Sequence, residues 1–223
     1  FFRLPDGRAW IGHGPFESLA HMPSTGGAFY INDFDLSDPK PWKVPTKLEQ
    51  VDSALLCQSA SFKVTETPFI QWAKPATEWF KMAFRRIRRE VLAKRLVKMV
   101  PVLTERGTIV SGDPICLLDR IMNAPSNTWG YARIEGNQGF LGATPELLFR
   151  SKDHQVETMA LAGTAKPGAH EAFLQDVKEI DEHEIVVRYL QDQLSPLGEV
   201  NREPRDLCHT SKLLHFQSNL TVK

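Results

Sequence analysis

Two glutamates, Glu179 and Glu182, stand three residues apart in a segment whose apolar residues recur at helical spacing. Residues three apart share one face of a helix, so both carboxylates can converge on one point beside it. Such a pair suits a hard divalent cation, which prefers oxygen ligands. A charged helix face in solvent is the alternative interpretation, and this segment taken alone favours it.

A second unusual position is Lys98, which interrupts a mostly apolar stretch at residues 96–103. Apolar surroundings disfavour the charged form of a lysine and can make its amine available as a base. The alternative is a lysine at a strand edge, whose stem packs on apolar neighbours while its ammonium reaches water. The residue types alone favour the second interpretation.

Two further positions lie where predicted strands turn or end. Glu146 follows a predicted hairpin, in a tight connection that can aim a side chain into a cleft. Gly163 and Thr164 end a predicted strand, and the missing Cβ of glycine lets a ligand approach the backbone. Taken alone, Glu146 is better explained as an ordinary surface turn residue, and small residues at a strand end carry little weight.

The elements that would position these residues change along the chain. The first third is rich in Gly and Pro, and short alternating segments at residues 27–31 and 59–64 predict strands. Apolar residues at helical spacing predict an amphipathic helix over residues 76–95. The stretch at residues 96–103 is compatible with a strand.

The middle and the end of the chain predict a helix, a hairpin, a strand and a second long helix. A helix is predicted at residues 114–122, with Asp113 as its N-cap. A period of two on both sides of a turn predicts a hairpin over residues 128–142. After a strand at residues 156–161, a helix is predicted from Glu171. Its buried stripe comprises Phe173, Val177, Ile180, Val187 and Leu194.

Composition argues against several classes of protein. The 223 residues carry 27 basic and 27 acidic side chains, which gives no electrostatic case for nucleic acid or a membrane surface as partner. The basic run at residues 85–89 is interpreted as a solvated helix face. No apolar run approaches the ~18 residues of a membrane span, and no signal peptide is evident. Cys57, Cys116 and Cys208 form no metal-ligand pattern, which indicates free thiols and a cytoplasmic setting.

Five short segments occur in a characteristic order. They are residues 97–100 (Val-Lys-Met-Val), 140–146 (Phe-Leu-Gly-Ala-Thr-Pro-Glu), 161–164 (Leu-Ala-Gly-Thr), 178–183 (Lys-Glu-Ile-Asp-Glu-His) and 214–216 (Leu-His-Phe). In this order they resemble the signatures of the chorismate-binding enzymes. That family includes isochorismate, salicylate, anthranilate and aminodeoxychorismate synthases. The similarity extends from about Trp79 to Phe216.

The resemblance implies an α+β fold of the anthranilate synthase component I type. Layered antiparallel β-sheets are flanked by helices, and the substrate lies in a cleft between sheets. A strand-rich part at residues 1–74 and a catalytic region at residues 75–223 then belong to one continuous domain. The implied substrate is chorismate, a cyclohexadiene dicarboxylate with a hydroxyl at C4.

The resemblance also implies catalytic and metal-binding roles. Lys98 is the base that activates water, and Glu146, kept protonated by burial, is the acid that protonates the departing hydroxyl. Glu182 is a ligand of Mg²⁺, and Glu179 is a neighbouring or water-mediated partner of the ion. These roles describe an isochorismate synthase, an Mg²⁺-dependent isomerase that adds water at C2 and expels the C4 hydroxyl.

Substrate-binding positions and the choice of reaction follow from the same resemblance. Gly163 and Thr164 bind a substrate carboxylate, and Ala162 and His215 lie near the substrate. Enzymes that form aminodeoxychorismate carry a nucleophilic lysine where this chain has Ala162, and anthranilate synthases have a non-basic residue at the position of Lys98. Isochorismate synthase therefore leads. Salicylate synthase and an anthranilate synthase-like enzyme are the alternatives, and the product could feed menaquinone or siderophore synthesis.

The family pattern continues beyond the last matching segment. Its later elements are a second metal-binding glutamate, an Ile-Arg substrate clamp and a glycine-rich strand, and none follows Phe216 before the last residue, Lys223. We therefore expect an incomplete fold, weaker Mg²⁺ binding and little or no turnover by this chain alone. Exposed sheet edges would favour self-association. A non-catalytic, chorismate-binding remnant is the alternative from another functional class.

Overall fold

The computed structural model describes residues 1–53, 66–75, 77–136, 138–210 and 212–223. The chain forms two compact units, each made of two stretches. The first unit comprises Phe1–Thr65 and Pro114–Thr144, and the second comprises Glu66–Asp113 and Pro145–Lys223. Each unit is a group of residues that mainly contact one another. The expectation of one continuous domain, with a strand-rich part at residues 1–74 and a catalytic region at residues 75–223, stays a prediction.

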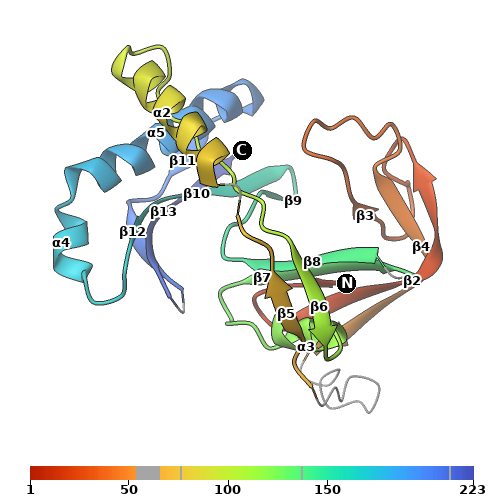
Figure 1. Ribbon diagram of the computed structural model, residues 1–223. Coiled ribbons are helices and arrows are strands. Elements are labelled where there is room, and N and C mark those ends of the chain that lie inside the picture. The colour runs from red at the N-terminus through yellow and green to blue at the C-terminus, as the bar shows by residue number, and fades with distance from the viewer. Residues whose placement is uncertain (54–65, 76, 137, 211) are drawn as a thin grey trace. The chain divides into compact units, whose positions relative to one another are not determined.

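The first unit is built on a six-stranded antiparallel sheet with the order β3-β4-β2-β1-β7-β8 (Figure 1). Its strands are β1 (Phe2–Arg3), β2 (Arg8–Leu19), β3 (Phe29–Tyr30), β4 (Trp42–Asp52), β7 (Trp129–Glu135) and β8 (Gln138–Thr144). Helix α3 (Ile115–Met122) packs against β7 and β8. Leu118 and Met122 of the helix and Ala132 of β7 form the buried core of this unit.

Local sequence patterns predicted much of the first unit. The hairpin is confirmed: β7 and β8 pair with Glu135 opposite Gln138, and Gly136 in the turn has a φ of +57°. The strand expected at residues 27–31 is β3, whereas the strand expected at residues 59–64 lies outside the described residues. Helix α3 begins one residue later than predicted, and Pro114 precedes it.

The second unit contains a five-stranded antiparallel sheet with the order β11-β13-β10-β9, and β12 also pairs with β13. Its strands are β9 (Arg150–Lys152), β10 (Gln155–Ala165), β11 (Val200–Arg202), β12 (Asp206–His209) and β13 (Leu214–Val222). The helical elements are α4 (His170–Leu174), α5 (Val177–Leu194) and the 3-10 turn η2 (Ser195–Leu197). Helix α5 packs on β10 and β13, as Figure 1 shows.

Burial on β13 alternates strictly from Leu214 to Val222, so every second side chain enters the core beneath α5. The long helix predicted from Glu171 is divided into α4 and α5. Phe173 and Val187 are buried as predicted. The prediction is wrong for Val177, which is 68% exposed, because the break puts this residue in a new first turn, out of phase with the stripe.

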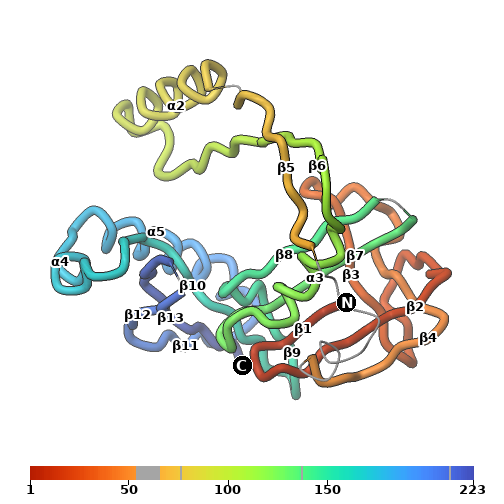
Figure 2. The backbone as a smooth tube through the Cα atoms, turned by 60° about the horizontal axis from the view of Figure 1, so that its bottom comes forward, coloured from red at the N-terminus to blue at the C-terminus, as the bar shows by residue number. Residues whose placement is uncertain are grey.

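The remaining part of the second unit runs from residue 66 to residue 113. It contains the two-stranded antiparallel sheet of β5 (Phe69–Trp72) and β6 (Gly107–Ser111) and the predicted amphipathic helix, α2 (Thr77–Leu92), and Figure 2 follows the chain through them. The strand considered for residues 96–103 is wrong, since these residues form no helix or strand. Pro101 lacks an N–H for a strand ladder, and β6 begins only at Gly107.

The structure bears on two expectations from the sequence, which concern membrane-spanning helices and the state of the cysteines. Among the described residues, no helix combines the length and the apolar character that a membrane span requires. Cys116 and Cys208 are free thiols, whereas Cys57 lies outside the described residues. Burial raises the pKa of the Cys208 thiol, so this thiol is poorly reactive.

Candidate functional site

Strand β10 carries a β-bulge at the centre of the candidate site. The strand does not end at residues 162–164 as predicted but continues to Ala165, with a register shift between Ala162 and Thr164 against β13. Gly163 has a φ of +76°, a left-handed conformation that favours glycine. A Cβ atom here would lie 2.8 Å from the carbonyl oxygen of Glu179, so this glycine admits the backbone of α5.

The N-terminus of α5 orients the first carboxylate of the site. Asp176 caps the helix and accepts hydrogen bonds from the amides of Lys178 (3.0 Å) and Glu179 (3.2 Å). In many helices a glutamate at the position of Glu179 bonds back to the amide of the cap residue. Here the Asp176 amide donates to the Phe173 carbonyl instead, at 3.1 Å. The Glu179 carboxylate accepts a hydrogen bond from the amide of Thr164, at 2.7 Å.

The second carboxylate, Glu182, pairs with Lys98. The distance between Lys98 Nζ and Glu182 Oε1 is 2.6 Å, and the two side chains are 26% and 32% exposed. Lys98 is thus held by an ion pair rather than by an apolar pocket. Burial acts to raise the pKa of Glu182, but the ion pairs with Lys98 and Lys178 outweigh it and lower that pKa below its ordinary value.

Lys178 contacts both carboxylates, although the sequence analysis gave it no role. Together with Lys98, Glu179 and Glu182 it forms a polar cluster. Its Nζ lies 2.7 Å from Glu179 Oε1 and 3.0 Å from Glu182 Oε2. These two hydrogen bonds raise the pKa of Lys178. The spacing of four residues to Glu182 was a usable signal, because such residues are neighbours on a helix. The contact with Glu179 depends on the side-chain conformation, which the sequence does not fix.

His215 completes the polar network on β13, next to the bulge. Its Nδ1 lies 3.1 Å from the carbonyl oxygen of Gly163 and 3.2 Å from Oγ1 of Thr164. Because a carbonyl oxygen only accepts hydrogen bonds, the contact with Gly163 is a hydrogen bond donated by Nδ1. The substrate contact expected of His215 stays a prediction.

Glu146 follows β8 and lies in the electrostatic field of two basic residues. Burial raises the pKa of its carboxyl group, whereas His215 and Lys98 act to lower it, and burial prevails. The residue as a whole reaches solvent, but enough protein surrounds the carboxyl group to make its ionisation less favourable. A carboxyl group of this kind keeps its proton to a higher pH and can act as an acid.

The structure brings the predicted site residues together within the second unit. Ala162 is set apart, because its side chain is buried at 8% exposure and its backbone pairs with Phe216. Hydrogen bonds and ion pairs join most of the others in one chain that also includes Lys178. In order these residues are Lys98, Glu182, Lys178, Glu179, Thr164, His215 and Gly163.

His183 is a positioning residue that sequence reasoning missed. It is fully buried, and its Nε2 lies 3.0 Å from the hydroxyl of Ser218 on β13. Its ring meets that of Phe216 edge-on, with 5.9 Å between the centroids. Burial lowers the pKa of His183, which favours the neutral form. This contact holds α5 on the sheet one residue after Glu182.

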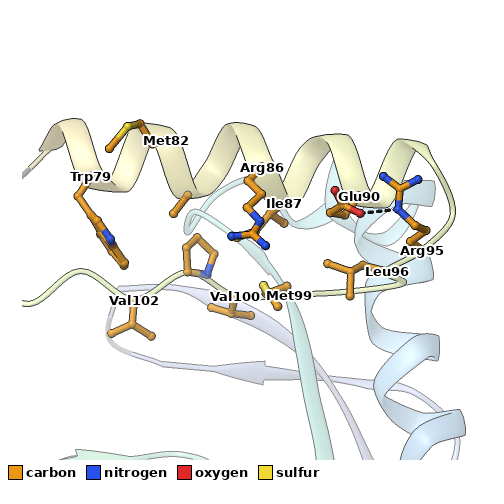
Figure 3. A pocket seen from close by; sticks show the side chains of 12 residues that line it. Trp79, Met82, Arg86, Ile87, Glu90, Arg95, Leu96, Met99, Val100 and Val102 are labelled. Atoms are coloured by element: carbon orange, nitrogen blue, oxygen red, sulfur yellow. Dashed lines mark hydrogen bonds and ion pairs between the residues drawn. The ribbon is translucent and has the colours of Figure 1, made fainter.

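A separate apolar groove lies between α2 and the segment that follows it (Figure 3). The cavity measures about 800 Å³, and an ion pair between Arg95 and Glu90, at 2.6 Å, lies on its wall. Its apolar lining includes Trp79, Met82, Ile87, Met99, Val100 and Val102. Lys98 does not line the groove, so the groove and the polar cluster are distinct features.

The donor set of the cluster fits a magnesium ion. In the part of the chain that the structure describes, no three His, Cys, Asp or Glu side chains are grouped to hold a metal ion. Magnesium is commonly bound by one or two carboxylates and several waters, and Glu179 and Glu182 are donors of that kind. The ammonium of Lys178 contacts both carboxylates and already places a positive charge between them.

Comparison with known proteins gives one family. The sequence matches the family model of chorismate binding enzymes over residues 38–222. It is 30% identical over 118 residues to a salicylate biosynthesis isochorismate synthase from Pseudomonas aeruginosa, covering 49% of this chain and 25% of that protein. It is 30% identical over 122 residues to anthranilate synthase component 1 from Methanothermobacter thermautotrophicus, covering 49% and 26%. The matched segment spans about a quarter of the length of these curated relatives.

A solved structure from Bacillus anthracis supports the fold. It is described as a candidate 2,3-dihydroxybenzoate-specific isochorismate synthase, DhbC, and matches with a TM-score of 0.76 at 17% sequence identity. The match covers 100% of this chain and 67% of that one. At this identity the likeness concerns the fold alone, and it confirms the expected α+β architecture of antiparallel sheets flanked by helices.

Proposed function

Because the chain belongs to the family of chorismate-binding enzymes, we propose that it converts chorismate to isochorismate. Water is added at C2 of the ring, and the C4 hydroxyl departs. The observation that carries this proposal is that one unit holds three kinds of group. They are the lysine Lys98, the carboxyl group of Glu146 with its raised pKa, and two carboxylates that form ion pairs with lysines. The exchange of one hydroxyl for another requires a base and an acid, and this set provides both.

Lys98 is the proposed base. An amine can take a proton from water only in its neutral form, whereas the pair with Glu182 is one of the ammonium form, so this pair has to open before proton transfer. Arginine at this position would keep the positive charge but could not lose its proton. The two functions of this residue, pairing and proton transfer, can therefore be separated by mutation.

Glu146 is the proposed acid. Burial raises the pKa of its carboxyl group, which favours the protonated form that an acid requires. It would give its proton to the C4 oxygen as the carbon–oxygen bond breaks. After the reaction the carboxylate is stabilised by His215 and Lys98, the two basic residues that already act to lower its pKa.

Contact with the substrate is proposed for Thr164 and His215, and the Thr164 hydroxyl is the donor suited to a substrate carboxylate. The amide of Thr164, expected to be a backbone donor to the substrate, already donates to Glu179. The Thr164 hydroxyl and the His215 ring are the groups at this position that can turn toward a ligand. Mg²⁺ held by Glu182, with Glu179 beside it, would neutralise and orient the ring carboxylate.

An anthranilate synthase-like reaction is the second candidate, because one matched relative is an anthranilate synthase component 1. That reaction uses ammonia in place of water, and the proposed base Lys98 argues against it. Salicylate synthase is a third outcome, in which isochorismate is formed first and pyruvate is then eliminated. The products of the three reactions differ, so one assay separates them.

The test is to incubate the chain with chorismate and Mg²⁺, with and without ammonium ions, and to separate the products by liquid chromatography. We expect isochorismate without ammonium ions, at the low turnover anticipated for this chain alone. Anthranilate formed only with ammonium ions, or salicylate with pyruvate, would replace the proposal by the corresponding alternative. A folded chain that binds chorismate without turnover would indicate an incomplete catalyst or a non-catalytic remnant.

Three lysine variants assign the role of Lys98. Lys98→Ala and Lys98→Arg should both lower turnover by about 10²- to 10⁴-fold, the usual contribution of a general base. The control, Lys81→Ala, removes an exposed lysine of α2 that pairs with Glu78, and it should leave turnover unchanged. Full activity of Lys98→Arg would mean that this residue contributes only its charge.

A further inference from the structure

Each carboxylate oxygen of Glu179 and Glu182 has a partner in the structure. Glu179 binds Lys178 through Oε1 and the Thr164 amide through Oε2. Glu182 binds Lys98 through Oε1 and Lys178 through Oε2. Lys178 is the residue that contacts both carboxylates, so its ammonium stands where one cation would meet them both.

From this geometry we infer that Lys178 is a displaceable counter-ion of the divalent-cation site and sets the affinity of that site. In the metal-free protein its ammonium bridges the two carboxylates and, together with the ammonium of Lys98 on Glu182, balances their charge. A divalent cation can bind them only after the ammonium has moved into solvent. This inference rests on the magnesium site of the proposed function, and it assigns to Lys178 a role that the reaction itself does not require.

The exposure of the three side chains supports the displacement. The Lys178 side chain is 71% exposed, whereas those of Glu179 and Glu182 are 14% and 32% exposed. The carboxylates are therefore held by the protein, while the lysine is free to swing into water. Exposed ion pairs contribute little to stability, so the exchange of an ammonium for a divalent cation has a low cost.

The direction of the helix also distinguishes Lys178 from an ordinary stabilising ion pair. A glutamate that precedes a lysine by four residues stabilises a helix better than the reverse order, because the charges then agree with the helix dipole. Lys178 precedes Glu182, the less favourable order, and it lies in the positive first turn of α5. Its position is thus explained by the two carboxylates rather than by the stability of the helix.

The experiment is a calorimetric titration of the full chain with Mg²⁺, repeated with Mn²⁺, in the absence of substrate. Lys178→Met and Lys178→Gln remove the competing ammonium and should lower the Kd by about 2- to 30-fold, the range expected for the loss of two weak ion pairs. Lys178→Arg retains a competing cation and should bind Mg²⁺ no more tightly than the wild type. The matched control, Lys81→Met, removes another exposed helix lysine that pairs with a glutamate and should leave the Kd unchanged.

The outcomes separate this inference from the proposed function. Equal or weaker binding of Mg²⁺ by both neutral variants would overturn the counter-ion role, whatever the turnover of chorismate. Tighter binding by both variants would support it, even if no isochorismate is formed. Absence of Mg²⁺ binding in every variant and in the wild type would overturn both the counter-ion role and the magnesium site.

Discussion

Two regions of the second unit hold the candidate site residues in different ways. Glu179 and Glu182 stand on α5, whose contacts with β10 and β13 include the fully buried residues Ala160 and Val187. Lys98 lies in the region of residues 66–113, where no described residue is buried. The ion pair between Lys98 and Glu182 joins the two regions.

This difference separates two ways of positioning a functional group. Apolar burial fixes the carboxylates, because any movement of α5 would open the core beneath it. The lysine is positioned by charge and by the course of the chain, since its own region has little buried surface. Segments with few buried apolar contacts open at low free energy, so the amine is expected to be more mobile than the carboxylates that it meets.

The largest expected effect compares the two regions through their aromatic residues. Phe216 is fully buried and stacks on Phe173 with 4.0 Å between the ring centroids. Phe216→Ala should lower the free energy of unfolding by about 3–5 kcal/mol. Trp79→Ala, which removes a residue of α2 that is 55% exposed, should lower it by less than about 1 kcal/mol. Urea unfolding measures both, and equal losses would remove the distinction between the regions.

An intermediate effect tests how closely α5 rests on the bulge. Gly163→Ala requires a left-handed alanine and brings Cβ to 2.8 Å from the Glu179 carbonyl oxygen. Gly136 is also left-handed, but a Cβ there meets no atom within 4 Å. Gly136→Ala should cost about 1–2 kcal/mol, and Gly163→Ala should cost more. Thermal unfolding of the two variants measures the difference. An equal loss of stability would mean that α5 can move away from the new Cβ atom at no cost in free energy.

The smallest expected effect concerns pH, and its sign differs for two glutamates. The pKa of Glu182 is lowered, so its contribution to stability is present above its unfolded value and is lost as the pH falls through the folded pKa. The pKa of Glu146 is raised, so stability falls as the pH rises from the unfolded value through the folded pKa. Unfolding curves between pH 3 and 7, compared with those of Glu182→Gln and Glu146→Gln, should show slopes that change in opposite directions. A common direction would contradict this assignment.

Local periodicity was sufficient to predict the elements that depend on near neighbours. The helix at Thr77–Leu92 and the hairpin of β7 and β8 follow from the spacing of apolar residues and from turn residues. The break between α4 and α5 was not predicted, because it depends on Asp176 acting as a cap inside a continuous apolar pattern. The bulge at Gly163 was missed for a related reason, since it is defined by the partner strand β13.

The candidate site shows the same limit. The shared helix face of Glu179 and Glu182 follows from their spacing. In the structure both carboxylates accept hydrogen bonds from the ammonium of Lys178. The hydrogen bond from Thr164 to Glu179 and the ion pair from Lys98 to Glu182 join residues 15 and 84 positions apart. No local pattern contains such contacts, and only the order of the family segments indicated that these residues would meet.

The start of α5 shows a conflict between the local sequence and the fold. Asp176 and Glu179 have the spacing of a self-contained cap, which would close on itself in a free peptide. In the folded chain the Asp176 amide donates its hydrogen bond to the carbonyl oxygen of Phe173. The Glu179 carboxylate accepts a hydrogen bond from Thr164 of strand β10 instead. Glu179 therefore does not make the capping interaction that its own helix favours. Such a conflict between local preference and fold is expected at functional sites.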